Sequence, residues 1–568
     1  MARSVRVFAI AAMLVVAVTA SGTASAVTPN GPSGGAAADT YQNPVSLPDV
    51  ENFGSPTLIR GHDGFWYAFG PGNPLNHGEE RPLFPIMRSP DLTSWSYVGD
   101  VFTPDTFPTW AKEDSNMWAP SIEYVNGRYH LYFTLRNIAG YEQTPNTAIG
   151  VATAPTPTGP WTDSGRPLVT PKTWQPPDAP PRYRTIIDAD ALITPYGDRY
   201  LYYGGFGGGV YGIRLSGDGM STVGEERRLT AAQIYEGPYV VHRDGWYYMF
   251  VSSGHCCKGP VTGYAVQVGR SRDPMGPFVD AEGIPLAADS PGGTQVLTAN
   301  GNTFVGTGHN AAVTDLAGQQ WLTFNGIDRT HPYLGEPLRE NRRPLLLDRL
   351  DWIDGWPTVR GGAGATDGPT AAPAATGWLV DAFEEGDQPG DSWRPSHHWR
   401  IEREPAGGYL ATGVPDGERM LDSATAVAGD ARVRAAVRLG DGTTGAAGFA
   451  LAHHGDSDAA RVLIDRDADA LVIDVTKDGD RVARTTAPLP PSFSYRSWHD
   501  LDVTVRGRTV VAEVTSAGLF DPVATVEATL PTGLEAGPVA LLARDTAADV
   551  DDVTAARLHT PETTRAPT

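Results

Sequence analysis

The sequence predicts an all-β protein: a five-bladed β-propeller followed by a β-sandwich of the jelly-roll kind. Three observations lead to this prediction. Five segments repeat one form, a tight turn and then an aromatic-rich strand, and they begin roughly 50 to 75 residues apart. No segment between residues 40 and 360 has a long helical period of apolar residues. Beyond a Gly/Ala/Pro-rich stretch, a second region of short alternating strands follows.

The five aromatic segments predict the number of blades. Each follows a turn that usually contains Gly or Asp and is rich in Trp, Tyr, Phe and Leu, which is typical of the second strand of a hairpin. A plain sandwich with aromatic core strands is the alternative, but the long spacing favours four-stranded blades joined by loops. The segments are GFWYAFG from Gly64, GRYHLYFT from Gly127, DRYLYYGG from Asp198, GWYYMFVS from Gly245 and GQQWLTFNG from Gly318.

The remaining parts of the chain are assigned by composition. The N-terminus carries Arg3 and Arg6, then an apolar run and Ala24-Ser25-Ala26, a pattern typical of a secretory signal, so we expect a secreted, extracellular protein. The leader is rich in Pro, Gly and Ala, and we expect it to be disordered and the tail to be loose. The expected parts are a signal peptide (1–26), a disordered leader (27–39), the propeller (40–360), a linker (361–377), the sandwich (378–558) and a tail (559–568).

The net charge argues against some kinds of partner, and the cysteines exclude some kinds of cross-link and metal site. The formal net charge of -22 would repel nucleic acid, and no later segment has about 18 uninterrupted apolar residues, so we expect neither a nucleic-acid nor a membrane partner. A monomer is expected. The two cysteines, Cys256 and Cys257, are adjacent, which excludes a disulfide framework and leaves either a strained vicinal disulfide or two thiols. Two adjacent thiols and His255 do not make a zinc site.

Two carboxylates hold matching places in consecutive blades. Glu236 stands at the start of the fourth blade's first strand, and Asp188 stands at the same place in the third, with Asp190 two residues further on. Taken singly, each would be interpreted as a solvated or ion-paired carboxylate at a strand end. Equivalent placement near a central channel favours glycoside hydrolysis instead, in which burial would raise the pKa of Glu236 and suit it as an acid.

Several motifs carry a resemblance to a known family. The runs IIDADALI, EGPYVV, GWYYMFVSSGHCCKG, VGRSRDPMGPFVDAEG, GTGHNAAVTDLAGQQWLTFN and LDWIDGWP together resemble glycoside hydrolase family 43, in its arabinan-degrading branch, over residues 40–360. The resemblance implies a five-bladed propeller that cleaves α-L-arabinofuranosyl bonds in plant-type polysaccharide or oligosaccharide by an inverting mechanism. It implies Glu236 as the general acid and Asp188 as the carboxylate that tunes the pKa of the acid.

The resemblance also bears on cofactors, on the cysteines and on the second region. It implies that no cofactor is required and that His309 lies at the propeller axis, beside a structural calcium or other ion, although the sequence has no calcium-type acidic cluster. The alternative for His309 is a buried, hydrogen-bonded histidine. The cysteine pair holds the same place as in the family motif, which favours the oxidised form. The run WLVDAFEEGDQPGDSWR resembles the start of concanavalin-like sandwich domains appended to such enzymes.

The chain departs from the family pattern at two positions. Ser55, before Pro56, occupies the position of the usual base aspartate, and Ser121 follows Trp-Ala-Pro where relatives carry an acid. A serine hydroxyl is not a base near neutral pH. Three hypotheses stay open: another acid is the base, the substrate or bound water takes its place, or the protein binds glycans without cutting them. A xylosidase or galactosidase is a further alternative. The candidate acids are Asp49, Glu51, Asp63 and Asp114.

Aromatic and polar residues near these strands are the candidates for contacts with the sugar. Aromatic rings stack on the C–H faces of sugars, although most aromatics in the five segments are expected in the core. Trp118, in a Trp-Ala-Pro corner, is the aromatic that we favour for substrate binding. The other candidates are Phe53, Trp66 and Tyr235 for stacking, and Ser121 and Asp190 for polar contacts.

Overall fold

The computed structural model is almost entirely β-structure, which confirms the predicted fold class. In the part of the chain that it describes, the helices are two short 3-10 turns, η1 (Gly259–Val261) and η2 (Arg360–Gly362). No helix in the described part of the chain is long and apolar enough to cross a membrane. The expected signal peptide and leader and nearly all of the expected tail lie outside the described residues. These are residues 40–559, without residues 126, 143–145, 177, 336–339, 456, 516–520 and 535.

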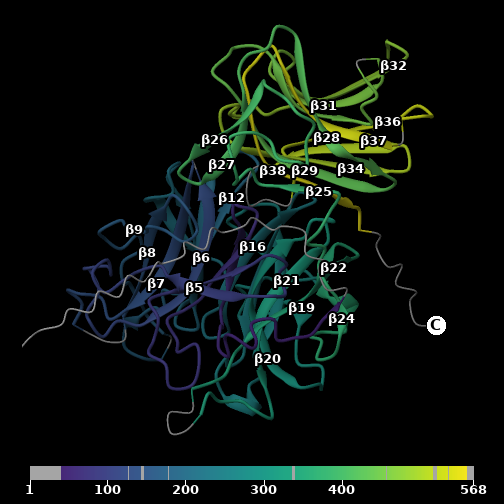
Figure 1. Ribbon diagram of the computed structural model, residues 1–568. Coiled ribbons are helices and arrows are strands. Elements are labelled where there is room, and N and C mark those ends of the chain that lie inside the picture. The colour runs from purple at the N-terminus through teal and green to yellow at the C-terminus, as the bar shows by residue number, and fades with distance from the viewer. Residues whose placement is uncertain are drawn as a thin grey trace, which may run out of the picture. The chain divides into compact units, whose positions relative to one another are not determined.

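Five four-stranded antiparallel sheets follow one another along the chain, each in simple sequence order. Figure 1 draws their strands in purple to teal. The blades are β2 (Thr57–Arg60), β3 (Trp66–Phe69), β4 (Pro85–Ser89) and β5 (Ser96–Asp100); β6 (Met117–Val125), β7 (Arg128–Arg136), β8 (Thr147–Ala154) and β9 (Thr162–Asp163); β12 (Asp190–Ile193), β13 (Arg199–Gly205), β14 (Gly209–Leu215) and β15 (Thr222–Arg228); β16 (Tyr235–Arg243), β17 (Trp246–Ser253), β18 (Ala265–Ser271) and β19 (Thr294–Leu297); and β20 (Phe304–Thr314), β21 (Gln320–Asp328), β22 (Leu345–Ile353) and β23 (Trp356–Val359).

The five sheets form a closed ring. The first strand of each blade contacts the first strand of the next, and β20 of the last blade contacts β2 of the first. The chain before the first blade fastens this closure: Val45 N–H donates to Leu345 O at 3.0 Å, and Asn43 Nδ2 donates to Leu347 O at 3.0 Å. Two further pairs of short strands lie outside the blades: β1 (Thr40–Tyr41) with β24 (Thr370–Ala371), and β10 (Thr173–Trp174) with β11 (Arg182–Tyr183).

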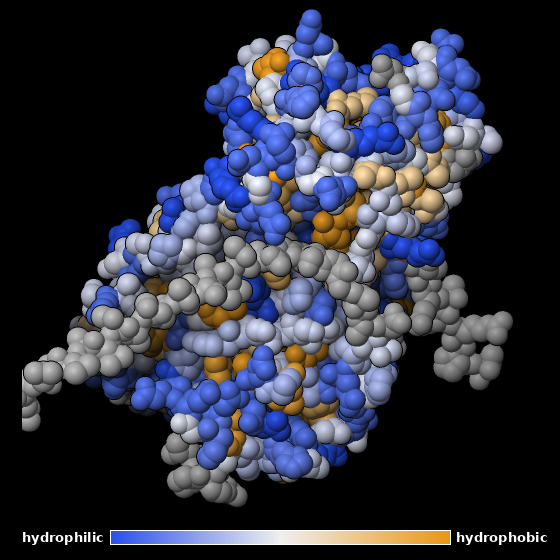
Figure 2. All heavy atoms as spheres, viewed as in Figure 1, coloured by the Kyte–Doolittle hydropathy of each residue, from blue (hydrophilic) through white to orange (hydrophobic). Residues whose placement is uncertain are grey.

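The aromatic segments are the second strands of the blades, as the repeat predicted. Their side chains fill the spaces between neighbouring blades: Phe69 of the first blade and Phe133 of the second lie in one cluster, which is continuous with Trp161. Large rings suit this position because adjacent blades splay apart and leave a wide gap to fill. On the face drawn in Figure 2, hydrophilic residues predominate and the apolar ones form small separate groups, consistent with apolar side chains in these cores.

A two-sheet sandwich follows the propeller strands, drawn in green to yellow in Figure 1. One core cluster, with Trp399 and Phe449 among its fully buried members, draws on both sheets. Alternation of apolar and polar residues produces this packing, since alternate side chains of a strand face the same side. In spatial order the first sheet is β26 (Trp399–Glu404), β27 (Gly407–Thr412), β38 (Ala548–Arg557), β29 (Ala431–Leu439), β34 (His499–Arg506), β35 (Thr509–Thr515) and β36 (Ala524–Thr529), with β25 (Leu379–Asp381) on β38; the second is β28 (Glu418–Ala428), β37 (Ala536–Arg544), β30 (Ala446–Leu451), β31 (Ala459–Asp465), β32 (Ala470–Lys477) and β33 (Asp480–Pro488).

Sandwich residues bond to the hairpin ends of the blades. Arg60, at the end of β2, pairs with Asp552 at 2.7 Å. The turn between β16 and β17 donates its Asp244 N–H to Asp521 Oδ1 at 2.6 Å. Both contacts lie at the turn between a blade's first and second strands. The starts of the first strands, at the other end of the ring, take no part in these two contacts.

Candidate active site

The first strand of each blade is irregular close to its start. In the second, fourth and fifth blades the pairing with the second strand is interrupted by a bulge. In the first and third blades the strand begins only after Ser55 and Asp188. Bulges re-aim side chains and are frequent beside active sites. The irregular positions therefore gather at one end of the ring, away from the hairpin turns.

Three non-glycine residues at these irregular positions have left-handed backbone conformations. The φ angles are 51° at Ser55, 56° at Asp188 and 53° at His309, and Gly237, directly after Glu236, has a φ of 57°. Such conformations cost of order 1 kcal/mol or more in non-glycine residues and persist where the surroundings impose them. They cluster at functional sites, which makes this end of the propeller the candidate site.

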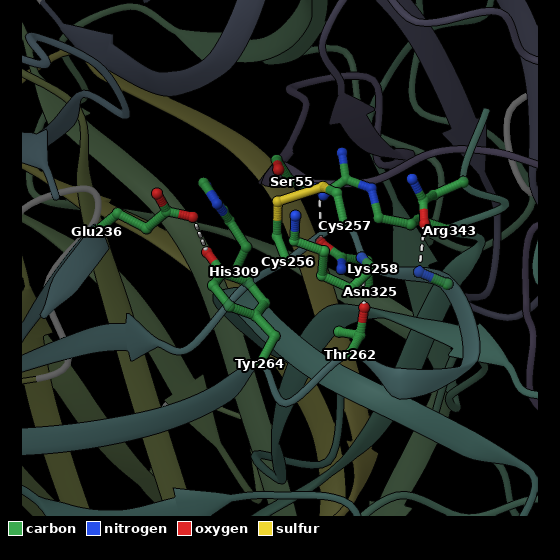
Figure 3. Close-up of a disulfide and its surroundings, with 12 residues drawn as sticks. Ser55, Glu236, Cys256, Cys257, Lys258, Thr262, Tyr264, His309, Asn325 and Arg343 are labelled. Carbon is green, nitrogen blue, oxygen red and sulfur yellow. Dashed lines mark hydrogen bonds between the residues drawn. A yellow bond between two sulfur atoms is a disulfide. The ribbon is translucent and has the colours of Figure 1, made fainter. Parts of the chain in front are cut away.

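Glu236 is a buried carboxyl whose pKa suits proton donation. Burial raises the pKa to about 7, while the hydrogen bond from Tyr264 and the charge of Arg343 act to lower it. Tyr264 OH donates to Glu236 Oε1 at 2.8 Å, and Figure 3 shows this pair on one side of the site. A carboxyl that is partly protonated near neutral pH can give its proton to a departing oxygen.

Asp188 lies next to this acid. Its Oδ2 accepts a hydrogen bond of 3.1 Å from the N–H of Gly237, and its own N–H donates to Thr134 Oγ1 at 3.1 Å. Burial first, and then the charge of Glu236, raise the pKa of Asp188 well above its usual value. Two buried carboxyls that influence each other in this way titrate as a pair, so each sets the proton affinity of the other.

His309 is a neutral imidazole packed against this pair. Its Nδ1 lies 4.0 Å from Asp188 Oδ2, and a Cβ on Gly237 would come within 3.1 Å of that nitrogen. Burial, and after it the charge of Arg343, lower the pKa of His309 to about 3. The described residues include no group of three or more His, Cys, Asp or Glu side chains placed to hold a metal ion. With a guanidinium close by as well, the calcium or other ion expected at His309 does not fit these residues.

Arg343 is a site residue that the sequence analysis missed. It is only 8% exposed, and its guanidinium lies against the backbone of Gly54, where a Cβ would be 2.8 Å from Cζ. Its charge acts on Glu236, on His309 and on Asp188. Tyr264 was missed as well. Two adjacent arginines, Arg342 and Arg343, stand before Pro344 in a chain that has fewer basic residues (44) than acidic ones (66). This pair was the sequence signal that could have pointed to Arg343.

Ser55 lies beside this arginine (Figure 3), and Ser121 lies between the second and third blades. The N–H of Ser55 donates to Asn325 Oδ1 at 3.0 Å, which ties the first blade to the fifth. The hydroxyl of Ser121 accepts a hydrogen bond of 3.2 Å from Ala191 N–H, which ties the second blade to the third. Ser121, predicted to bind substrate, therefore has a structural partner.

The remaining predicted contacts divide into buried and accessible residues. Asp190 is buried, and its Oδ2 accepts from Val240 N–H at 2.7 Å, so it joins the third and fourth blades. Phe53, Trp66 and Tyr235 are each 1% exposed, which leaves their rings in the core and not available for stacking. Trp118 is half-buried at the start of β6 and keeps an accessible surface.

Of the four candidate bases, three have a side-chain partner and the fourth is exposed. Asp63 lies in the turn at the far end of β2 and accepts a hydrogen bond from Tyr67 OH at 2.6 Å. Asp114 accepts from Asn137 Nδ2 at 3.0 Å. Glu51 pairs with Arg342 at 3.1 Å, and Asp49 is exposed; these two precede the Ser55 corner in the chain.

The two cysteines are bonded to each other in the loop between β17 and β18. Their Cα atoms are 3.8 Å apart, as they must be for neighbours in the chain. Figure 3 draws the disulfide among Ser55, His309 and Arg343. Lys258 N–H donates to Thr262 Oγ1 at 2.7 Å, and Gly259 N–H donates to Asn341 Oδ1 at 2.8 Å, so the loop is fastened directly after the bridge.

A closed five-bladed ring with a near-neutral glutamic acid and a second carboxyl at one end defines the class of protein: a glycoside hydrolase. The sequence profile of glycosyl hydrolases family 43 matches residues 41–357, more than half of the chain, and the chain belongs to this family.

Relatives were found over the same part of the chain. A protein of Aspergillus flavus named "Probable arabinan endo-1,5-alpha-L-arabinosidase A" is 29% identical over 334 residues, 56% of this chain and 94% of the relative. The extracellular endo-alpha-(1->5)-L-arabinanase 1 of Bacillus subtilis is 29% identical over 313 residues, 53% and 86% of the two chains. A crystal structure of an exo-1,5-alpha-L-arabinanase from a bovine ruminal metagenomic library has 26% identity and a TM-score of 0.44, covering 56% of this chain and 99% of that one.

Proposed function

We propose that this protein is a secreted glycosidase that hydrolyses α-1,5-linked L-arabinofuranosyl chains, with Glu236 as the general acid and Asp188 as its partner. The observation that carries the proposal is the buried carboxyl of Glu236, with a pKa raised to about 7 beside a second carboxyl. The names of the relatives support the choice of arabinan over xylosyl or galactosyl substrates.

The proposed chemistry is a single displacement. Glu236 gives its proton to the leaving glycosidic oxygen while a water attacks the anomeric carbon from the opposite face, so the configuration inverts. Two adjacent buried carboxyls resist losing both protons, so the pair of Glu236 and Asp188, held by Gly237 N–H, keeps one proton for the leaving oxygen. Trp118 is the accessible aromatic surface on which a sugar ring would stack.

The proposal also covers the location of the protein, the charge of its substrate and its oligomeric state. The N-terminal pattern of Arg3, Arg6 and Ala24-Ser25-Ala26 supports secretion, and the relative from Bacillus subtilis carries the word extracellular in its name. The net charge of -22 favours a neutral polysaccharide or oligosaccharide over a polyanion. We expect a monomer.

A panel of linear arabinan, arabino-oligosaccharides, xylo-oligosaccharides and galacto-oligosaccharides tests the proposal. The purified protein should release reducing sugar from the arabinose-containing substrates, and Glu236→Gln should abolish the release. Proton NMR of the first products should show inverted anomers. Release from xylosyl or galactosyl substrates alone would move the assignment to that sugar, and products with retained configuration would refute the single displacement.

Ser55 favours a second candidate, a propeller that binds glycans without cutting them. Loss of the assisting base commonly costs about 10²- to 10⁴-fold in rate. In this case wild type and Glu236→Gln would bind arabino-oligosaccharides equally well in calorimetry, and neither would release sugar. Faster release by the wild type than by Glu236→Gln would exclude it.

A further inference from the structure

The site holds a buried cation without a salt bridge. Among the described residues, no carboxylate oxygen lies within 4.0 Å of the guanidinium of Arg343, although Arg342 beside it pairs with Glu51 at 3.1 Å. Arg343 is more than nine-tenths buried. Burying an arginine without a paired anion is unfavourable, so an anion that bound here would offset part of that cost.

The residue next to this cation has lost its carboxylate relative to the family pattern. The guanidinium lies against Gly54, and the next residue is Ser55, where the resemblance to the family leads us to expect an aspartate. Figure 3 shows Ser55 and the side chain of Arg343 near the disulfide, with Glu236 on the other side of the site. Serine is shorter than aspartate and carries no charge, so it does not neutralise the guanidinium.

A second cation flanks the same place. Lys258 follows the disulfide, is exposed, and has no carboxylate partner among the described residues. Figure 3 draws its side chain alongside the disulfide. In a chain with a net charge of -22, two neighbouring cations, neither in a salt bridge among the described residues, form a local anion-attracting region.

We propose that Arg343, assisted by the hydroxyl of Ser55 and by Lys258, binds a carboxylate that the chain itself does not supply. The ligand class is a carboxylate anion, from an acidic sugar unit of the substrate or from a small organic acid in solution. Carboxylate fits because a guanidinium binds it through two parallel hydrogen bonds.

The bound carboxylate replaces the missing base, a step that rests on the proposed function. It takes one proton from the attacking water as the water oxygen bonds to the anomeric carbon. The glycosidic C–O bond breaks, and its oxygen receives the proton of Glu236. The carboxylic acid formed then returns its proton through solvent to the Glu236 carboxylate, so the net reaction is hydrolysis.

Calorimetric titration of the full-length protein with formate and with glucuronate, at fixed ionic strength in chloride, tests the subsite without requiring activity. Wild type should bind at least one of them, and Arg343→Met should weaken that binding at least tenfold. Arg342→Met, the matched loss of the neighbouring arginine, should leave it unchanged. Absence of binding to the wild type would overturn the proposal, as would equal losses in the two variants.

Ser55→Asp keeps the proposal testable if Arg343→Met does not fold. Aspartate tolerates the left-handed backbone at this position at least as well as serine and would pair with the guanidinium. This variant should no longer bind formate or glucuronate, and its unfolding midpoint should rise. Unaltered binding, or a lowered midpoint, would show that the cation is not next to residue 55 in the way proposed.

Turnover identifies the source of the carboxylate. With a neutral arabino-oligosaccharide, saturating formate should raise the rate at least tenfold over chloride if the anion comes from solution. With an arabino-oligosaccharide that carries a uronic acid, turnover should be at least tenfold faster than with the neutral one in chloride if the substrate supplies it. Binding without acceleration in either arm would overturn the base assignment. A protein inactive on all substrates, with Ser55→Asp also inactive, would count against the proposed function, while the titration would still decide the subsite.

Discussion

Replacing Tyr264 by Phe tests how the proton affinity of Glu236 is set. The phenol donates to Glu236 Oε1 at 2.8 Å, and this hydrogen bond favours the ionised carboxylate. Tyr264→Phe keeps the ring and removes only the donor. A hydrogen bond to a charged group contributes about 1.5 to 3 kcal/mol, and one pKa unit corresponds to about 1.4 kcal/mol. The pKa of Glu236 should therefore rise by about 1 to 2 units.

The pH dependence of kcat/KM on arabino-oligosaccharide measures this shift. A general acid must be protonated to work, so activity falls as pH rises through its pKa, which is about 7 in the native protein. In Tyr264→Phe the alkaline limb should move up by the calculated shift. Tyr248→Phe is the matched control, because it removes a hydroxyl of the same blade that donates to Gly355 O, at 2.7 Å, and not to Glu236. An alkaline limb that stays in place or moves down would refute the assignment of Glu236 as the acid.

Four further predictions concern the carboxyl pair and the closure of the ring. Asp188→Asn should move the alkaline limb of kcat/KM to lower pH, because a coupled pair of carboxyls gives up its last proton at a higher pH than a single carboxyl does; a limb moved upward would contradict it. The raised pKa of Glu236 stabilises the folded protein fully below pH 4.5, and this contribution is lost as pH rises through about 7. In the wild type this loss should lower the unfolding free energy, measured in urea, by about 3 kcal/mol between these pH values. Glu236→Gln should remove this pH dependence, and an unaltered slope would count against it. Gly237→Ala should lower stability by about 1 to 3 kcal/mol, since its φ is 57° and the new Cβ would lie 3.1 Å from His309 Nδ1; an unaffected melting temperature would argue against this packing. Asn43→Ala should cost about 1 to 3 kcal/mol in urea unfolding because it leaves the buried N–H of Leu347 in β22 without its partner, and a cost near zero would mean that the ring closes without this contact.

The blade count was predictable because each blade repeats one local pattern. A turn followed by an aromatic strand carries its own signal, and the same requirement for large rings recurs wherever two blades face each other. Glu236 and Asp188 were predictable for a related reason: the repeat aligns the blades, so two carboxylates at matching places stand out against it.

Residue types did not reveal which side chains reach the site. Phe53 and Ser121 have suitable chemistry, yet the ring of Phe53 is buried and the hydroxyl of Ser121 bonds Ala191 N–H. A one-residue bulge decides which way a side chain points, and the sequence gives little warning of it. Tyr264 and Arg343 were missed because their partners lie in other strands or blades.

The sequence alone determined the all-β class, the five blades, the second β-region and the placement of two carboxyls, because each depends on a local or repeating pattern. Only the tertiary structure decided the chemistry around them: the proton affinity of Glu236, the neutrality of His309 and the cation beside Ser55. These properties arise from burial and from charges on strands distant in the chain, and closure of the ring brings them together.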